Sequence, residues 1–196
     1  SDQAFFTRYA LGVDPAALRD SGHGTVALEE HCRFHREVTS GGMMIGRSAV
    51  IEPRERTMVV YQEFRDAKDA LQASFRTVIG FFDTKARRLM PWPEATREKA
   101  AKLTIDLPDH AAPLRVPAGG AVGQVSREVS IAEGFFRSGG TGVNSWECDQ
   151  FGHMNTMFYV RRQTEAGPHF WQFLGLDQPG LIASGHGFAV SELRMN

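Results

Sequence analysis

The sequence predicts an α+β protein that combines an antiparallel sheet with one long helix. The sheet is predicted by four strand-like runs, separated by short turns, at residues 25–38, 43–52, 57–65 and 70–83. Strands joined by turns this short are antiparallel neighbours. The helix is predicted by the apolar residues that follow Asn155, which suit about four or five turns. Pro168 lies within this stretch, and we expect it to break or kink the helix.

Shorter elements flank these two features, and local signals predict each of them. Gly12 is typical of a residue that ends a helix, and Asp14-Pro15 is typical of a helix start. Before the sheet we expect the last turns of a helix at 2–12 and a short helical piece at 14–18. After the sheet we expect a connector at 84–124, which contains a helical piece at 95–103 and a linker at 108–123. Two further strands are expected at 125–131 and 143–148.

Composition indicates an ordinary soluble globular protein of one large or two small domains. The chain has 196 residues, a hydrophobic share of 42% and a formal net charge of −1. This balance does not favour nucleic-acid binding, and no apolar run approaches the roughly 20 residues of a membrane span. The first residues do not have the pattern of a secretory signal. The two cysteines, Cys32 and Cys148, make no metal or disulfide framework, so a reducing cytoplasmic setting is expected.

One stretch concentrates the residues that can do chemistry. Asp149, Gly152, His153, Asn155 and Tyr159 follow one another in the pattern Asp-x-x-Gly-His-Met-Asn-x-x-x-Tyr. The pattern lies where the predicted strand turns into the long helix. Unpaired backbone N–H groups and the helix dipole favour negative charge at such a turn, which suits a developing oxyanion.

This pattern resembles the acyl-CoA thioesterases of the hotdog superfamily, in particular the 4-hydroxybenzoyl-CoA thioesterase group. The resemblance implies a curved antiparallel sheet wrapped around a long helix. It also implies hydrolysis of an acyl-CoA to a carboxylic acid and free coenzyme A, with no metal and no cofactor other than the coenzyme A of the substrate. In that family the acid that matches Asp149 attacks the thioester carbonyl or activates water.

An internal repeat predicts a tandem arrangement. Residues 174–187 align without a gap on 11–24; both begin with Leu-Gly and end with Ser-Gly-His-Gly, and Glu192 then falls on Glu29. We therefore expect the back half of a first hotdog unit, a connector and the front half of a second unit, at residues 1–83, 84–124 and 125–196. The two units are expected to pair about a pseudo-two-fold axis. Both chain ends look cut, so we also expect a homo-oligomer.

Each residue of the motif has a second, structural interpretation. Asp149 is predicted to be catalytic, but it could also cap the following helix. His153 and Asn155 are candidates for carrying a proton and orienting a water, or for satisfying backbone groups of the turn. Gly152 is expected to have a left-handed backbone, and its N–H or that of His153 is a candidate for facing the thioester oxygen. Cys148 is either a nucleophile assisted by histidine and asparagine or, more simply, buried and inert.

Candidates elsewhere concern substrate binding. Tyr159 ends the motif and is expected near the substrate. Glu29 either lines the cleft as a second acid or faces water. Arg87 and Arg88 follow Lys85 after the fourth strand, where they either hold coenzyme A phosphates or form a solvated strand end. The repeated His23 and His186 suggest a structural task, and His31 and His35 suggest a polar strand face without metal-ligand spacing.

Two other functions remain open from the sequence. One is a hotdog hydratase or dehydratase, which also needs a positioned acid and base near an acyl thioester. The other is a non-catalytic module that binds acyl-CoA and has kept the fold.

Overall fold

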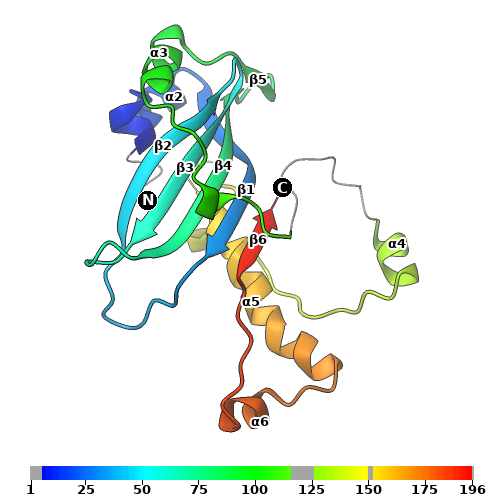
Figure 1. The fold of residues 1–196 in the computed structure, drawn as a ribbon. Helices are drawn as coiled ribbons and strands as arrows, with labels where there is room; N and C mark the ends of the chain where they lie inside the picture. Colours follow the sequence, from blue (N-terminus) through cyan, green and yellow to red (C-terminus); the bar gives the residue numbers. More distant parts are fainter. Residues whose placement is uncertain (1–5, 116–125, 150–151, 196) are drawn as a thin grey trace. The chain divides into compact units, whose positions relative to one another are not determined.

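A six-stranded antiparallel sheet is the largest feature of the computed structural model, which describes residues 6–115, 126–149 and 152–195 (Figure 1). The chain divides into two compact units. We call residues 1–122 with 190–196 the sheet unit, and residues 123–189 the helical unit.

The sheet confirms the four predicted strands and joins them in one layer. Its order is β2-β3-β4-β1-β6, and β5 pairs with the end of β4. All pairings of named strands are antiparallel, as the short turns require. The strands are β1 (His23–Phe34), β2 (Ile45–Pro53), β3 (Thr57–Arg65), β4 (Leu71–Asp83), β5 (Arg88–Met90) and β6 (Glu192–Met195).

Short helices at the ends of the sheet follow the predicted signals. The described part of the first one, η1 (Phe6–Ala10), is followed by Gly12, which has a positive φ of 72°. The side chain of Asp14 then accepts a hydrogen bond from the N–H of Ala16 at 3.2 Å and caps the next helix. The remaining helices of the sheet unit are α2 (Pro15–Asp20), α3 (Glu94–Lys102) and η2 (Asp109–Ala111).

The core lies on one face of the sheet, which we call the inner face. Here Met58 and Val60 of β3 and Ile79 of β4 are fully or almost fully buried. Leu11 and Trp92 cover them from outside the sheet, and the Trp92 ring lies 5.4 Å from that of Phe81. Burying these side chains is the main source of stability for the sheet unit.

The connector after α3 crosses the opposite face, which we call the outer face, and its residues Leu114 and Arg115 contact Glu192 of β6 (Figure 1). The hydroxyl of Tyr61 lies 2.7 Å from Nε2 of His110 and donates to Glu63 at 2.9 Å. Arg33 donates to the carbonyls of His110 and Ala112, at 2.7 and 2.8 Å. The described part of the connector is therefore fastened to the sheet by polar contacts. Residues 116–123 of the predicted linker lie outside the described residues.

Strands β1 and β6 pair about a local two-fold. His31 lies opposite Arg194, which is its counterpart in the aligned repeat. The side-chain contacts obey the same symmetry, because Glu29 contacts Arg194 at 3.2 Å and its counterpart Glu192 contacts His31 at 2.7 Å. This agrees with the pseudo-two-fold that the repeat predicted, although the assignment of the chain to tandem units stays a prediction.

The two Ser-Gly-His-Gly loops of the repeat have the same local structure. The Ser21 hydroxyl lies 2.9 Å from Nδ1 of His23, and the Ser184 hydroxyl lies 3.0 Å from Nδ1 of His186. Both serine hydroxyls also donate to the backbone carbonyl three residues earlier, at 2.8 Å. These contacts support the structural task expected for the two histidines.

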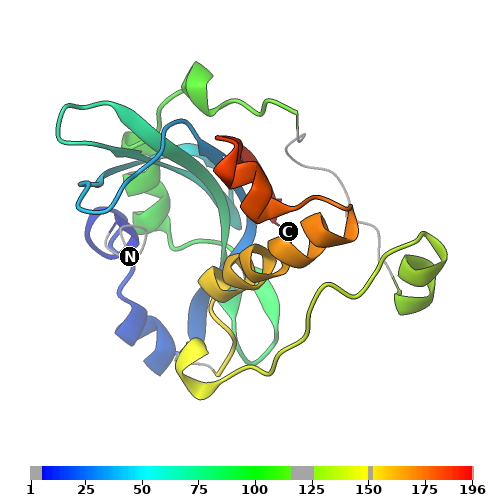
Figure 2. The same cartoon turned by 90° about the horizontal axis from the view of Figure 1, so that it is seen from below.

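The helical unit corrects two predicted strands and excludes a break in the long helix. Residues 127–132 form a helix instead of a strand, because the Ser126 hydroxyl accepts from the N–H of Val129 and caps it. The strand expected at 143–148 is replaced by a 3-10 turn, since Asn144 and Glu147 form a capping box. The long helix runs through Pro168 without a break (Figure 2). The elements are α4 (Arg127–Ala132), η3 (Ser145–Glu147), α5 (Thr156–Phe173) and α6 (Gln178–Ala183).

Within the described residues, no helix is both long and apolar enough to cross a membrane.

Candidate active site

The start of α5 is capped by Asn155. Its side-chain oxygen accepts from the N–H of Met157 at 3.2 Å, and its backbone has the extended conformation of an N-cap. The interpretation of Asp149 as the cap of this helix is therefore wrong. Asn155 satisfies backbone at the helix start, as its structural interpretation proposed.

The carboxylate of Asp149 instead closes the turn that precedes α5. Oδ1 of Asp149 accepts from the N–H of His153 at 3.1 Å, and the backbones of the same two residues bond at 2.8 Å. Gly152 has a φ of 76°, as expected for a residue that must be glycine, and its N–H donates to the carbonyl of Asp149. The turn therefore holds an exposed carboxylate beside an exposed imidazole.

These bonds change the expected oxyanion donors. The N–H groups of Gly152 and His153 are already engaged by Asp149. The N–H of Thr156, the first residue of α5, has no acceptor among the described residues. Because the first N–H groups of a helix lack partners within the helix, Thr156 is the better donor for a substrate oxygen.

Glu147 is hydrogen-bonded to residues on both sides of the turn and was missed by the sequence reasoning. It is buried, and its carboxylate accepts from the backbone N–H of Asn144 at 2.8 Å and from Arg162 at 2.7 Å. The Asn144 N–H and then the Arg162 guanidinium hold the pKa of Glu147 below its usual value. The carbonyl of Glu147 accepts from the N–H of Asn155 at 2.8 Å. The Asn-x-x-Glu spacing of a capping box was the available signal.

The thiol of Cys148 contacts a backbone carbonyl and not the imidazole of His153. The thiol is half-buried and lies 3.5 Å from the carbonyl of Asn144. Among the described residues, no hydrogen bond joins Cys148 to an imidazole. This favours the inert cysteine over the nucleophile. Tyr159, one turn into α5, is 57% exposed and is available to a ligand of this unit.

Glu29 lies on the outer face of the sheet because of a bulge. The register of β1 against β4 shifts between Ala27 and Glu29, so that Glu29 contacts Arg194 and Glu30 turns to the inner face opposite Thr77. Burial raises the pKa of Glu30. Alternation counted from the first residues of β1 would place each of these glutamates on the other face. The sequence had pointed to Glu29 through its match to Glu192 in the repeat.

In the sheet unit, Arg87 lies in the turn between β4 and β5, and Arg88 is the first residue of β5. Both side chains are exposed, and Arg87 has a positive φ of 52°. His31 contacts Glu192, and His35 lies 2.9 Å from the Ser74 hydroxyl. The structure therefore assigns the turn at 149–155 to the helical unit and Glu29, Arg87 and Arg88 to the sheet unit.

Comparison with protein families decides the identity of the fold. A family model described as the thioesterase-like superfamily matches residues 3–100. The chain belongs to this superfamily. The match contains strands β1 to β5, whereas the turn at 149–155 lies outside it. The resemblance inferred from the motif is thus confirmed by a different part of the chain, and so is the α+β hotdog fold. A search of curated proteins finds no match.

Solved thioesterase structures share the fold of this superfamily member. A putative oleoyl thioesterase from Lactobacillus plantarum gives a TM-score of 0.61 at 13% identity, over 88% of this chain and 64% of its own. An acyl-ACP thioesterase from Bacteroides thetaiotaomicron gives a TM-score of 0.60 at 12% identity, over 83% of this chain and 60% of its own. A hypothetical protein from Staphylococcus aureus, solved in complex with CoA, gives a TM-score of 0.52 at 14% identity, over 59% of this chain and 76% of its own. The chain thus spans less than two thirds of either thioesterase.

Proposed function

We propose that this thioesterase-like protein hydrolyses an acyl-CoA thioester to a carboxylic acid and free coenzyme A. The observation that carries the proposal is the Asp149 carboxylate, which the N–H of His153 holds at an exposed turn immediately before α5. A carboxylate, an imidazole and a helix N–H that has no acceptor among the described residues can supply a base, a proton carrier and an oxyanion donor. Membership of the thioesterase-like superfamily supports the same reaction.

In the proposed mechanism, the thioester carbonyl lies over the turn with its oxygen toward the N–H of Thr156. Asp149 takes a proton from water as the water attacks the carbonyl carbon. In the alternative route Asp149 attacks that carbon itself, and after the thiolate has left, water hydrolyses the resulting acyl-Asp149 anhydride to the acid and free Asp149. The tetrahedral intermediate then releases the coenzyme A thiolate, which takes up a proton that His153 can deliver. Glu147 and Arg162 are positioning residues. The carbonyl of Glu147 accepts from the N–H of Asn155, and its carboxylate accepts from Arg162 of α5, so that together they fix the turn against the helix. Tyr159, Glu29, Arg87 and Arg88 remain proposed substrate contacts. The reaction as proposed uses no metal or redox cofactor.

Replacing Asp149 by Asn tests this mechanism. The amide keeps the size of the side chain and an oxygen that can accept from His153, but it removes the charge. We expect kcat to fall at least ~100-fold, equivalent to about 2.7 kcal/mol of barrier, while the thermal unfolding midpoint changes little. The assay follows free thiol released from a panel of acyl-CoA substrates.

Cys148→Ala is the matched control, since it changes the neighbouring residue and should cost little activity. Full turnover in Asp149→Asn, or loss of activity only in Cys148→Ala, would contradict the role of Asp149 and would favour Cys148 as the catalytic residue. The same assay separates the other functions, because a hydratase alters the acyl chain without releasing thiol and a binding module retains acyl-CoA without turnover.

We further propose that the protein self-associates and works in a reducing cytoplasmic setting. Both Cys32 and Cys148 are free thiols, which suits that setting. Many large apolar side chains are exposed in both units, which supports association.

A further inference from the structure

Glu30 places a carboxyl group on the apolar inner face of the sheet. It follows the bulge of β1, is half-buried, and lies opposite Thr77 of β4 on one side and Met195 of β6 on the other. Among the described residues, no hydrogen bond or ion pair engages its carboxylate, and burial raises its pKa. Its counterpart in the aligned repeat is Leu193. A charged group therefore lies where the repeat has an apolar side chain, and no cation in the described part of the chain compensates it.

A second unsatisfied polar group lies beside this carboxylate. The Thr77 side chain is 1% exposed, and its hydroxyl is buried with no hydrogen-bond partner in the part of the chain that the structure describes. Directly opposite residues of antiparallel strands share a face, with Cβ atoms about 5 Å apart. Buried polar groups normally have partners, because an unpaired one destabilises the fold. Two adjacent groups that both lack a partner indicate a place for an external one.

Aromatic rings continue the inner face next to these two groups. Phe75 lies two residues before Thr77 on β4, hence on the same face and within diagonal reach of Glu30. Its ring packs edge-to-face against Phe34 at 6.4 Å and against Phe64 at 5.5 Å. Phe34 is 42% exposed, so solvent reaches this part of the inner face. The carboxylate thus borders an aromatic surface that a ligand can contact.

These groups together select a cation with an apolar body. An ionised carboxylate only accepts hydrogen bonds and a threonine hydroxyl can also accept one, so the missing partner is a donor. A positive charge compensates the carboxylate, and phenylalanine rings attract cations through their faces. A primary ammonium has three N–H donors, enough for both oxygens. A metal ion fits less well, since no group of three His, Cys, Asp or Glu side chains within the described residues could hold one.

We propose that the inner face binds a primary organic amine, with its ammonium group between Glu30 and Thr77 and its apolar body on Phe75 and Phe34. The site lies in the sheet unit and does not depend on the proposed thioesterase reaction. It gives a reason for a glutamate at this position. Because the pKa of Glu30 is raised on folding, its ionised form destabilises the folded chain at neutral pH, and a bound cation offsets this destabilisation.

Calorimetric titration of the whole protein with phenethylamine at neutral pH tests the proposal. This amine is charged under these conditions, whereas phenethyl alcohol has the same skeleton without the charge. We expect Glu30→Gln to weaken amine binding at least about tenfold, since a hydrogen bond to a charged group is lost, and Thr77→Val to weaken it about threefold. Wild type should bind the alcohol at least about tenfold more weakly than the amine. Glu37→Gln, at an exposed loop position, is the matched control and should bind like wild type.

Thermal unfolding supplies a second measurement. Without ligand, Glu30→Gln should unfold at the same temperature as wild type or higher, because the substitution removes an uncompensated charge. Phenethylamine should raise the midpoint of wild type and leave that of Glu30→Gln unchanged. The proposal is overturned if wild type does not bind the amine, if amine and alcohol bind equally, or if Glu30→Gln binds the amine as tightly as wild type. A lower midpoint of unliganded Glu30→Gln also overturns it, because Glu30 would then stabilise the fold itself.

Discussion

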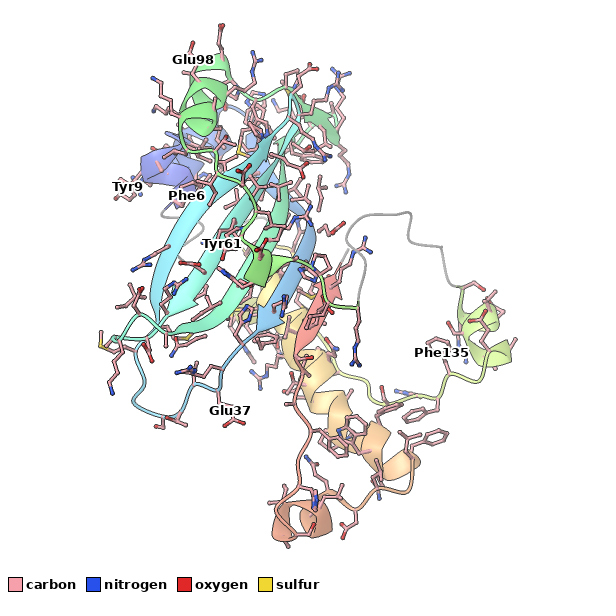
Figure 3. The ribbon with its side chains drawn as sticks, in the orientation of Figure 1. Phe6, Tyr9, Glu37, Tyr61, Glu98 and Phe135 are labelled. Atoms are coloured by element: carbon pink, nitrogen blue, oxygen red, sulfur yellow. The ribbon has the colours of Figure 1, made fainter. Side chains whose placement is uncertain are left out.

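At the scale of single residues, Glu63 shows how one carboxylate organises the outer face of the sheet. Arg65 donates to it at 2.6 Å, Tyr61 donates at 2.9 Å, and His110 of the connector lies 3.4 Å away (Tyr61 is labelled in Figure 3). The hydrogen bond from Arg65 is the main reason that the pKa of Glu63 lies below its usual value. Glu63 therefore links strand β3 to the connector through its charged form.

This pKa shift predicts how stability depends on pH. A carboxyl whose pKa is lower in the folded state stabilises it above the unfolded pKa, near 4.5, and this contribution is lost as pH falls through the folded pKa. We expect the free energy of unfolding, measured with urea, to decrease on acidification below about pH 4.5, and to decrease less steeply in Glu63→Gln. Glu37→Gln, at an exposed loop position labelled in Figure 3, is the control. An identical pH dependence in wild type and Glu63→Gln would contradict this account.

At the scale of elements, the pairing of β1 with β6 depends on a bulge. The shift after Ala27 moves Glu29 to the outer face, where it meets Arg194, and its counterpart Glu192 meets His31. Glu192 also accepts from the N–H groups of Leu114 and Arg115, both at 2.9 Å. Contacts of Glu29 and Glu192 therefore attach β6 to β1 and also to the connector. They explain why β6 joins the sheet although it is only four residues long.

A double-mutant cycle measures this contact between elements. The side chains of Glu29 and Arg194 are only 19% and 13% exposed, so solvent screens their interaction less than that of a surface pair. From Glu29→Ala, Arg194→Ala and the double variant we expect a coupling free energy of about 1 kcal/mol in chemical denaturation. The cycle cancels the other contacts of each residue. Additive effects of the two substitutions would show that the pair contributes nothing to the attachment of β6.

At the scale of the whole molecule, apolar surface remains uncovered in both units. None of the 18 residues of α5 is buried, and Met157 and Phe173 are 66% and 61% exposed. In the sheet unit, Met43 and Met44 precede β2 and are also exposed. Exposed apolar surface is typical of faces that contact another protein chain.

We therefore expect the protein to form a dimer or larger oligomer at micromolar concentration. Light scattering coupled to size exclusion measures the mass directly. Dilution should shift the mass toward the monomer and lower the thermal unfolding midpoint, because association stabilises the folded chain. A monomeric mass with a midpoint independent of concentration would contradict the proposal.

Local signals in the sequence determined much of this protein. Turn residues and strand-like runs determined the four central strands, Asp14 opened its helix, and the motif from Asp149 to Tyr159 indicated the family. The signals for these features, namely turn residues, apolar patterns and caps, lie within a few positions of one another, so a sequence displays them directly.

Only the tertiary structure decided the features that depend on distant partners. The bulge at β1 exchanged the faces of Glu29 and Glu30, because it arises from pairing with β4. Residues 143–148 have strand-like composition, but among the described residues no neighbouring strand pairs with them beyond the single bridge from Cys148 to Met154. A strand is stable only when another strand satisfies its backbone groups, whereas a helix or a capped turn satisfies its own. The capping contacts within 144–155 therefore prevailed, and they place Asp149 in an exposed turn.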